Sequence, residues 1–251
     1  MFIVLCYTQL HAALLSYPTD LANNVTTFGA SGADNVDDIK AIRDALAKDR
    51  SDVNADYNGR PKILYFPAGT YIISDSITWD GCAVTIQGQG TGATIFKLKD
   101  GAAGFNDPTH PKGVFVTPSG NMAFRQNFHD LTINTGTNNS GAMGLDYISS
   151  NTGRVRDVEI ISGDGAGVAG LSMMRQWPGP LLIKNLKVTG FNYGMQAGTA
   201  EYGPTFENLD LKNQLKARIL NQGNILAIRK YTSVNTVPAI QNPSGFVICL
   251  D

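Results

Sequence analysis

The chain has 251 residues, 43% of them hydrophobic and 16% charged, which is enough for one sizeable core in one or two domains. Its 20 Lys and Arg residues nearly balance its 21 Asp and Glu residues, which excludes overall attraction to nucleic acid or to an anionic membrane, although an anionic polymer could still bind a local basic patch. The 27 glycines and the sparse charge favour β-structure with many tight turns over helical bundles.

Residues 1–20 resemble a weak secretory signal. An apolar stretch and the small residues Ala12 and Ala13 fit such a signal, whereas the absence of Lys or Arg before them does not. The alternative is a disordered or mis-assigned start, and the stretch is too short and too polar to span a membrane. We therefore expect a secreted or extracytoplasmic protein.

One helix is expected, at residues 36–48, inside an N-terminal segment that covers 21–62. Ile39, Ile42 and Leu46 form a single apolar stripe, and acidic residues precede it as the helix dipole favours. Residues 49–61 are polar and are typical of a loop. Because the helix precedes the first β run, we predict that it covers the N-terminal end of the fold that follows.

Residues 63–251 contain short β runs separated by turn residues, beginning with 63–66, 71–73, 76–79 and 83–86. A repeat starts at residue 129, with clear copies at 129–133, 156–160, 184–188 and 207–211 and weaker ones at 223–228 and 245–248. The last apolar residues of these copies are separated by 27, 28, 23, 17 and 20 residues. Irregular steps of this size are typical of a solenoid whose coils have loops of varying length.

In each clear copy, two apolar residues flank a polar one, so the apolar pair faces inward and the polar residue outward. One coil cannot bury that face alone, whereas stacked coils share a continuous core. An Asx residue precedes each of these four strands, and Asx residues tolerate the left-handed conformation of a turn. We therefore expect a stacked column, which consists of Asp130, Asp157, Asn185 and Asn208.

The cysteines Cys6, Cys82 and Cys249 are far apart in sequence. Cys6 lies in the removable N-terminal segment. If Cys82 and Cys249 belong to distant coils, no disulfide can join them, so free thiols are predicted. The apolar run 246–250 at the C-terminus has no polar capping segment, from which we expect that the solenoid is truncated there; a terminal strand that pairs elsewhere is the alternative.

Three segments carry a resemblance to a known family. The segments Phe28-Gly29-Ala30, 64–73 (Leu-Tyr-Phe-Pro-Ala-Gly-Thr-Tyr-Ile-Ile) and Gln87-Gly88-Gln89-Gly90 resemble the opening of the pectate-lyase superfamily domain, and the likeness extends over roughly residues 25–250. That domain also occurs in glycoside hydrolases of family 55, which act on β-1,3-glucans, and in relatives of family 28. The resemblance implies an all-β fold, a right-handed parallel β-helix (a pectin-lyase-like solenoid), with the short N-terminal capping helix.

The same superfamily contains hydrolases, lyases, epimerases and non-catalytic fibres, so the fold does not decide the chemistry. We expect a carbohydrate-active protein, a glycoside hydrolase of the glucan or pectin class first, with a polysaccharide lyase or a non-catalytic glycan-binding or structural β-helix as alternatives. The family's catalytic residues find no counterpart here. Candidates must therefore come from the residues themselves.

One candidate surface is the outward column Thr132, Glu159, Lys187 and Asp210. It is interpreted either as a sugar-binding face or as a charge ladder between neighbouring strands, and the ladder is favoured because such surface pairs are common.

A second candidate site is borne by loops. Glu201 and Asp164 are the candidate catalytic carboxylates, in that order, since hydrolysis of a glycosidic bond needs two of them. Arg175, Trp177 and Tyr202 are candidates for substrate binding, because aromatic faces stack on sugar rings and Arg binds carboxylates. The alternative is that Trp177 packs over the solenoid edge and that Asp164 caps a turn.

No metal or other cofactor is predicted. His11, His110 and His129 share no ligand spacing, and the glycine-rich run 88–92 lacks the Lys and the helix of a phosphate loop. The expected partner is a polysaccharide substrate, with no nucleic acid and no membrane, and the oligomeric state stays open.

Overall fold

The computed structural model describes residues 22–48, 63–120, 123–198, 202–234 and 236–251. The predicted signal segment, Cys6 and the loop expected at 49–61 lie outside these residues. Of the described helices, none is long and apolar enough to cross a membrane.

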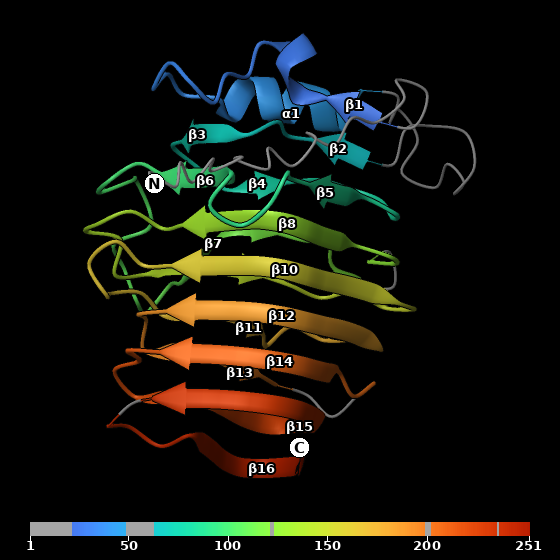
Figure 1. The fold of residues 1–251 in the computed structure, drawn as a ribbon, viewed down its shortest axis with the longest axis vertical. Coiled ribbons are helices and arrows are strands. Elements are labelled where there is room, and N and C mark those ends of the chain that lie inside the picture. The colour runs from blue at the N-terminus through green and yellow to red at the C-terminus, as the bar shows by residue number, and fades with distance from the viewer. Residues whose placement is uncertain (1–21, 49–62, 121–122, 199–201, 235) are drawn as a thin grey trace, which may run out of the picture.

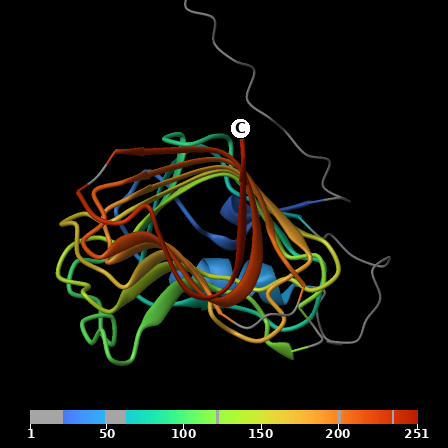
Figure 2. The same cartoon turned by 90° about the horizontal axis from the view of Figure 1, so that it is seen from below.

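The chain winds as a right-handed parallel β-solenoid of about seven turns, as predicted. Strands from successive coils stack one below another, and the earliest and latest coils lie at opposite ends of the stack (Figure 1). The view along the stack shows the coils superimposed around a common interior (Figure 2). The helices and strands are β1 Ala22–Asn24, the 3-10 helix η1 Val25–Phe28, α1 Ile39–Ala47, β2 Ile63–Tyr65, β3 Gly69–Ile73, β4 Ile77–Thr78, β5 Thr85–Gln87, β6 Thr94–Leu98, β7 Lys112–Val116, β8 Asn127–Asn134, β9 Ala142–Asp146, β10 Gly153–Ile161, β11 Ala169–Met173, β12 Leu181–Thr189, β13 Tyr193–Ala197, β14 Thr205–Lys212, β15 Ala217–Val234 and β16 Ile240–Leu250.

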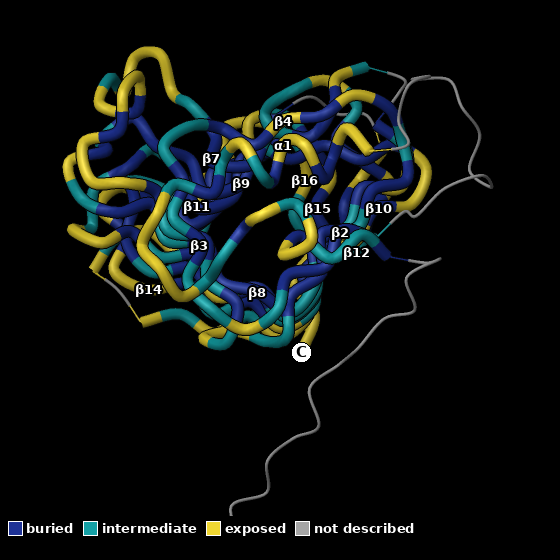
Figure 3. The backbone as a smooth tube through the Cα atoms, turned by 90° about the horizontal axis from the view of Figure 1, so that it is seen from above, coloured by how far each residue is buried: buried dark blue, intermediate teal, exposed yellow. Residues whose placement is uncertain are grey.

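Two walls of parallel strands enclose the core. The first wall, called the long wall below, runs β2-β5-β8-β10-β12-β14 and ends on the second half of β15. The second, called the short wall, runs β4-β7-β9-β11-β13 and ends on the first half of β15. Buried residues follow the walls, whereas exposed residues gather in the peripheral loops (Figure 3).

The predicted inward column is confirmed. Ile133, Ile160, Val188 and Leu211 are in register on successive strands of the long wall, and each has 0% of its surface exposed. Nearer the helix, aromatic rings continue the core in a chain of edge contacts. Their centroids lie 4.6 Å apart for Phe66–Phe96, 4.9 Å for Phe96–Phe115 and 5.3 Å for Phe115–Phe128. Stacking therefore buries the apolar side chains that a single coil would leave exposed.

The last two repeat copies were predicted in the wrong register. Leu211 pairs with Ser233 and not with Ile228, which pairs instead with Phe206. Ile248 pairs with Ala227. The reason is that β15 is one long strand whose apolar residues at 225–228 match the repeat motif. The last two of these residues pair with the part of β14 that precedes its own motif, so Ile228 lies beside Phe206.

The Asx column is confirmed. Asp130, Asp157, Asn185 and Asn208 have φ values of 58°, 53°, 53° and 61°, so each bends its strand through the left-handed conformation. Their side chains form a ladder, in which Asn185 Nδ2 donates to Asp157 Oδ1 over 2.7 Å and Asn208 Nδ2 donates to Asn185 Oδ1 over 2.8 Å. The coils are thus joined at this corner by side chains as well as by backbone.

The capping helix is confirmed, with shorter bounds than the predicted 36–48. It covers Ile39–Ala47 and buries Ile42, Ala45 and Leu46 on the end of the core, beyond β2 and β3 (Figure 1). The first three predicted residues are not helical because Asp37 forms a bridge with Ile72 of β3 and Val36 is 61% exposed.

Asp38 does not cap the helix with its side chain. Its carboxylate instead accepts hydrogen bonds from the backbone N–H groups of Ser31 (2.7 Å) and Ile72 (3.1 Å), so it ties the helix start to the first coil. No disulfide joins Cys82 to Cys249, as predicted.

Candidate functional site

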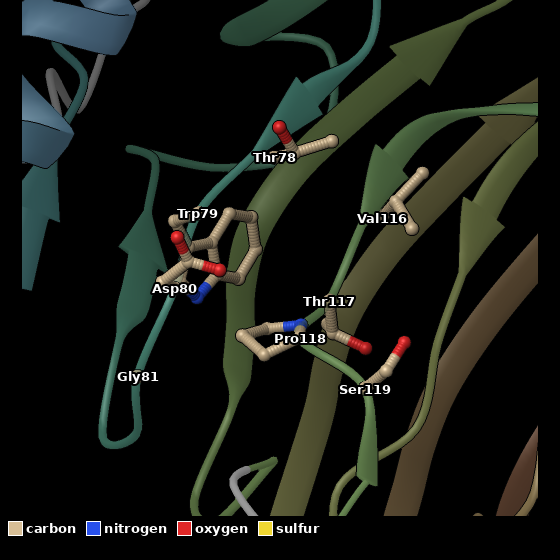
Figure 4. A pocket seen from close by; sticks show the side chains of 8 residues that line it. All are labelled: Thr78, Trp79, Asp80, Gly81, Val116, Thr117, Pro118 and Ser119. Atoms are coloured by element: carbon tan, nitrogen blue, oxygen red, sulfur yellow. The ribbon is translucent and has the colours of Figure 1, made fainter. Parts of the chain in front are cut away.

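A pocket of about 500 Å³ opens at one edge of the short wall, where the chain leaves β4 and β7. One side consists of Trp79, Asp80 and Gly81, and the other of Thr117, Pro118 and Ser119; Thr78 and Val116 lie at the strand ends between them (Figure 4). Apolar walls with a few converging polar groups are typical of ligand sites.

Trp79 forms a fixed wall of this pocket. Its side chain is only 8% exposed, its ring packs at 6.1 Å from that of Phe128, and its indole N–H donates to Gln126 Oε1 over 3.0 Å. Since ring packing and a hydrogen bond both fix the indole, Trp79 forms a preorganised wall of the pocket. Asp80 and Ser119 supply the polar groups at the mouth.

Arg175, a predicted substrate-binding residue, lies beside the pocket but is fully engaged. Its Nε donates to Asp146 Oδ1 (2.9 Å), and its Nη2 to the carbonyl of Asp146 (2.9 Å) and to Thr117 Oγ1 (3.0 Å). Its Nη1 contacts the carbonyls of Thr117 (3.0 Å) and Pro118 (3.4 Å) and Ser119 Oγ (3.1 Å). A guanidinium has five N–H donors, so six acceptors saturate it. Arg175 therefore fixes the pocket wall rather than offering a free fork to a ligand.

Asp146 is the most buried carboxylate beside the pocket. It ends β9, in register with Val116 of β7 and Ser172 of β11, so it lies on the outer side of the short wall. Burial raises the pKa of this carboxyl, and the neighbouring Arg175 guanidinium only partly offsets that effect. Gln196 continues the polar row on the next coil and donates to Ser172 Oγ over 3.0 Å.

Trp177 and Tyr202, the predicted aromatic contacts, follow β11 and β13 at the same edge of the short wall as the pocket. Both have the left-handed conformation, with φ of 62° and 60°, which is uncommon for bulky residues. Trp177 is half-buried and lies over Gly120, whereas Tyr202 is 59% exposed. The turns are stacked directly, since a Cβ at Gly179 would lie 2.4 Å from the Tyr202 carbonyl oxygen.

Asp164 lies at the opposite edge. It precedes β11, which spans Ala169–Met173, whereas Arg175 follows that strand, so five strand residues, or about 16 Å, separate the two. Its carboxylate accepts from the N–H groups of Asn138 (2.7 Å) and Ala166 (3.0 Å) and from Ser162 Oγ (3.2 Å). Slight burial raises the pKa of Asp164, but these hydrogen bonds outweigh it and lower the pKa overall. The contacts are those of a turn cap, the alternative interpretation of this residue. Glu201 lies outside the described residues.

The outward column is in register, as predicted: Thr132, Glu159, Lys187 and Asp210 are successive partners. The favoured charge ladder does not form as close pairs. Asp210 Oδ2 accepts from Lys212 of its own strand over 2.7 Å, and no ion pair within 4.0 Å reaches Lys187 in the described part of the chain. Thr132 is buried because the turn at Gly92 covers it and donates to its Oγ1 over 2.9 Å.

Among the residues that the structure describes, no group of three or more His, Cys, Asp and Glu side chains could hold a metal ion.

Reasoning from the sequence missed Asp80, Asp146 and the Thr117–Ser119 segment. The motif Trp79-Asp80-Gly81, an aromatic and an acid before a turn glycine, was the one local signal that could have pointed to Asp80. Asp146 ends an otherwise ordinary apolar strand, so nothing short of the strand register identifies it.

A family profile described as rhamnogalacturonase A/epimerase, pectate lyase-like, matches residues 22–238. No curated protein matches the chain significantly.

Several solved structures share the fold. ORF18 of Geobacillus virus E2 has a TM-score of 0.66 at 18% identity, covering 92% of this chain and 47% of that one. The catalytic domain of Agl-KA has a TM-score of 0.56 at 18% identity, covering 96% and 49%. The A-module of the mannuronan C-5 epimerase AlgE6 from Azotobacter vinelandii has a TM-score of 0.52 at 16% identity, covering 90% and 62%. The chain thus spans about half the length of the first two proteins.

Proposed function

The chain belongs to the rhamnogalacturonase A/epimerase, pectate lyase-like family, and from that premise we propose that it is a carbohydrate-active β-helix protein whose activity is hydrolysis of a glucan- or pectin-class polysaccharide. The site that supports this best is the pocket beside Asp146. The observation that carries the proposal is a buried carboxyl group with a raised pKa, Asp146, which is the register partner of Val116 in the pocket lining and pairs with Arg175.

The chemistry of hydrolysis needs an acid that protonates the leaving oxygen and a second carboxylate that activates water or attacks the sugar. Asp146 fits the acid, because burial raises the pKa of its carboxyl, which is the direction that a general acid needs. Asp80, in the pocket, and Glu201, the first candidate from the sequence, are the two choices for the second carboxylate.

The spacing of the coils favours inversion if Asp80 is that partner. Asp80 follows β4, and Thr78 of β4 is two coils from Asp146, through Val116. Coils about 4.8 Å apart place the backbones of Thr78 and Asp146 roughly 10 Å apart, and Asp80 lies two residues beyond Thr78. Carboxyl groups carried by such backbones reach the wider separation of inverting enzymes, about 6.5–9.5 Å, more readily than the 5–5.5 Å of retaining ones.

Binding would come from the rim. Trp177 and Tyr202 follow neighbouring strands on the pocket side, and their rings offer successive sugar units an apolar face. A lyase is a weaker candidate, since it needs a cation to neutralise a uronate, and the nearby Arg175 has no donor left to do so.

The test is release of reducing ends from a panel that contains pectin, rhamnogalacturonan and β-1,3-glucan. We expect Asp146→Asn to lower the rate about 100-fold or more, the usual contribution of a general acid. Asp164→Asn is the matched control, because it changes an Asp at the opposite edge, and it should leave the rate nearly unchanged. Equal rates for the parent and for Asp146→Asn would contradict the assignment of the acid, and unsaturated products would indicate a lyase instead.

Non-catalytic glycan binding is the second candidate function. One observation favours it: the Asp146 carboxylate accepts a hydrogen bond from Arg175, whose donors are all engaged, as in a purely structural ion pair. Binding without turnover by the parent, retained in Asp146→Asn and lost in Trp177→Ala, would select this alternative.

Secretion is also part of the proposed function, since a polymer of this kind is met outside the cytoplasm. Cleavage after the N-terminal segment on expression in a secreting host, detected by mass spectrometry, would support it. Retention of the intact chain inside the cells would count against it.

A further inference from the structure

Positive side chains gather on the outer face of the long wall, over β12, β14 and β15, which lie one below another in Figure 1. The register places Lys184, Glu207 and Arg229 in one column and Asn185, Asn208 and Lys230 in the next. Lys187 and Asp210 form a third column, and Lys212 lies on the same strand as Asp210. We call Lys184, Lys187, Lys212, Arg229 and Lys230 the basic cluster.

Three carboxylates are register neighbours of the basic cluster: Glu207 and Asp210 each have a lysine partner, whereas Glu159, the partner of Lys187 on β10, has no ion pair within 4.0 Å among the described residues. Glu207 Oε1 contacts Lys184 Nζ at 3.2 Å, and Asp210 Oδ2 contacts Lys212 Nζ at 2.7 Å. Lys187, Arg229 and Lys230 are exposed, and in the described residues none of them has an ion pair within 4.0 Å. Lys187, Arg229 and Lys230 therefore have no close ion-pair partner in the described part of the chain, although Glu159 is the neighbour of Lys187 on the adjacent strand.

Asp251 is a further carboxylate at this end of the cluster, because it follows Leu250, the partner of Arg229. It forms no ion pair within 4.0 Å with Arg229 or Lys230 in the part of the chain described.

The backbone of Lys230 provides an independent observation. Lys230 occupies the fifth position of the Asx column and has a φ of 55°, where the four coils above it have Asp or Asn. The left-handed conformation is strained for Lys, whereas Asn and Asp tolerate it. Because Asp or Asn would relieve this strain, the Lys at position 230 indicates that its side chain has a role other than stabilising the fold.

We propose that the basic cluster is a binding surface for an acidic polysaccharide, one that bears a carboxylate on its sugar units. Lys187 on β12 and the adjacent pair Arg229 and Lys230 on β15 lie two coils, about 10 Å, apart along the stack. A polymer that bears several anions can contact both places at once. The cluster lies on the long wall, away from the pocket at the edge of the short wall, so it holds the polymer outside the site of chemistry. The inference rests on the proposed function only in taking a polysaccharide as the partner.

The test compares binding of a polygalacturonate oligosaccharide with that of a neutral β-1,3-glucan oligosaccharide of equal length, at low and at high salt. We expect the double variant Lys187→Gln/Arg229→Gln to bind polygalacturonate about tenfold more weakly at low salt, since each exposed ion pair contributes up to about fivefold. Salt should reduce the affinity of the parent far more than that of the variant. Lys216→Gln removes an exposed lysine from a loop outside the cluster and should behave as the parent.

Lys230→Asn separates binding from folding. It should weaken binding of polygalacturonate severalfold and yet raise the melting temperature by about 2 °C or more, because Asn extends the ladder and relieves the strain. A variant that loses stability along with affinity would contradict this explanation.

Failure of the two proposals can be distinguished. Unchanged affinity in Lys187→Gln/Arg229→Gln, or no binding of polygalacturonate by the parent at low salt, would overturn the basic cluster as a binding surface even if Asp146 proves catalytic. Tighter binding of a single-stranded oligonucleotide than of polygalacturonate would assign the cluster to nucleic acid and overturn it as well. Conversely, Asp146→Asn should leave this binding intact.

Discussion

The Asn185 ladder allows a prediction about stability with a calculable size. Asn185 is held in the left-handed conformation, donates to Asp157 over 2.7 Å and accepts from Asn208 over 2.8 Å. Asn185→Ala removes both hydrogen bonds, at about 0.5–1.5 kcal/mol each, and forces a Cβ-bearing residue without a polar side chain into a conformation that costs about 1–2 kcal/mol. The expected loss of unfolding free energy is therefore about 2–5 kcal/mol.

Asn185→Gly separates the two contributions. Glycine also removes both hydrogen bonds but adopts the positive φ without strain, so its loss should be smaller than that of Ala by about 1 kcal/mol. Urea unfolding of the parent and of both variants, followed by circular dichroism, measures these values. Losses below about 0.5 kcal/mol for both variants, or a larger loss for Gly than for Ala, would refute the reasoning.

Three further predictions concern the core and the first coils. Ile160→Ala, at a position with 0% exposure between Ile133 and Val188, should lower the unfolding free energy by about 2–5 kcal/mol, whereas the neighbouring, half-buried Ile161→Ala should cost clearly less in the same urea titration. Gly88→Ala would place a methyl group 2.2 Å from the carbonyl oxygen of Asp130 and should cost about 1–3 kcal/mol, so a variant as stable as the parent would show that the two turns do not pack this closely. Burial first, and then the nearby Arg156, lower the pKa of His129 to about 4, below its ordinary value of 6.5. Between these two pH values the unfolded chain binds more protons than the folded chain. The stability that a neutral His129 contributes is therefore complete above about pH 6.5 and is lost as the pH falls toward 4. NMR titration of the His129 ring gives its pKa directly, and a value near 6.5 would remove this source of acid sensitivity.

The fold could be predicted from the sequence because its determinants are local. Each clear repeat copy carries its own alternation of apolar and polar residues and its own Asx residue. Asp157 therefore predicts a corner, and Val158 the strand after it, from the local sequence alone. Prediction failed at β15 because the same alternation continues through one long strand, and Ile228 then matches the motif at the wrong position of the coil.

The candidate site could be predicted only in part, because it is assembled across coils. Arg175, Trp177 and Tyr202 were proposed from their residue types, and all three follow strands of the short wall at the same edge. The partnership of Arg175 with Asp146, 29 residues away, depends on strand register, which side-chain chemistry alone does not reveal. Asp164 was grouped with these residues because its place in sequence did not show that β11 separates it from them.

The stacking register, on which both the pocket and the basic cluster depend, can be measured directly by disulfide trapping. In a background whose native cysteines are replaced by serine, Asp210→Cys/Thr232→Cys joins residues that are partners on β14 and β15. Partners on adjacent strands lie about 5 Å apart, within the range that a disulfide spans. We predict that this pair closes an intramolecular disulfide on mild oxidation and that Asp210→Cys/Ala227→Cys, the pairing implied by the sequence repeat alone, does not. Trapping of the second pair in place of the first would contradict the register and, with it, the layout of both surfaces.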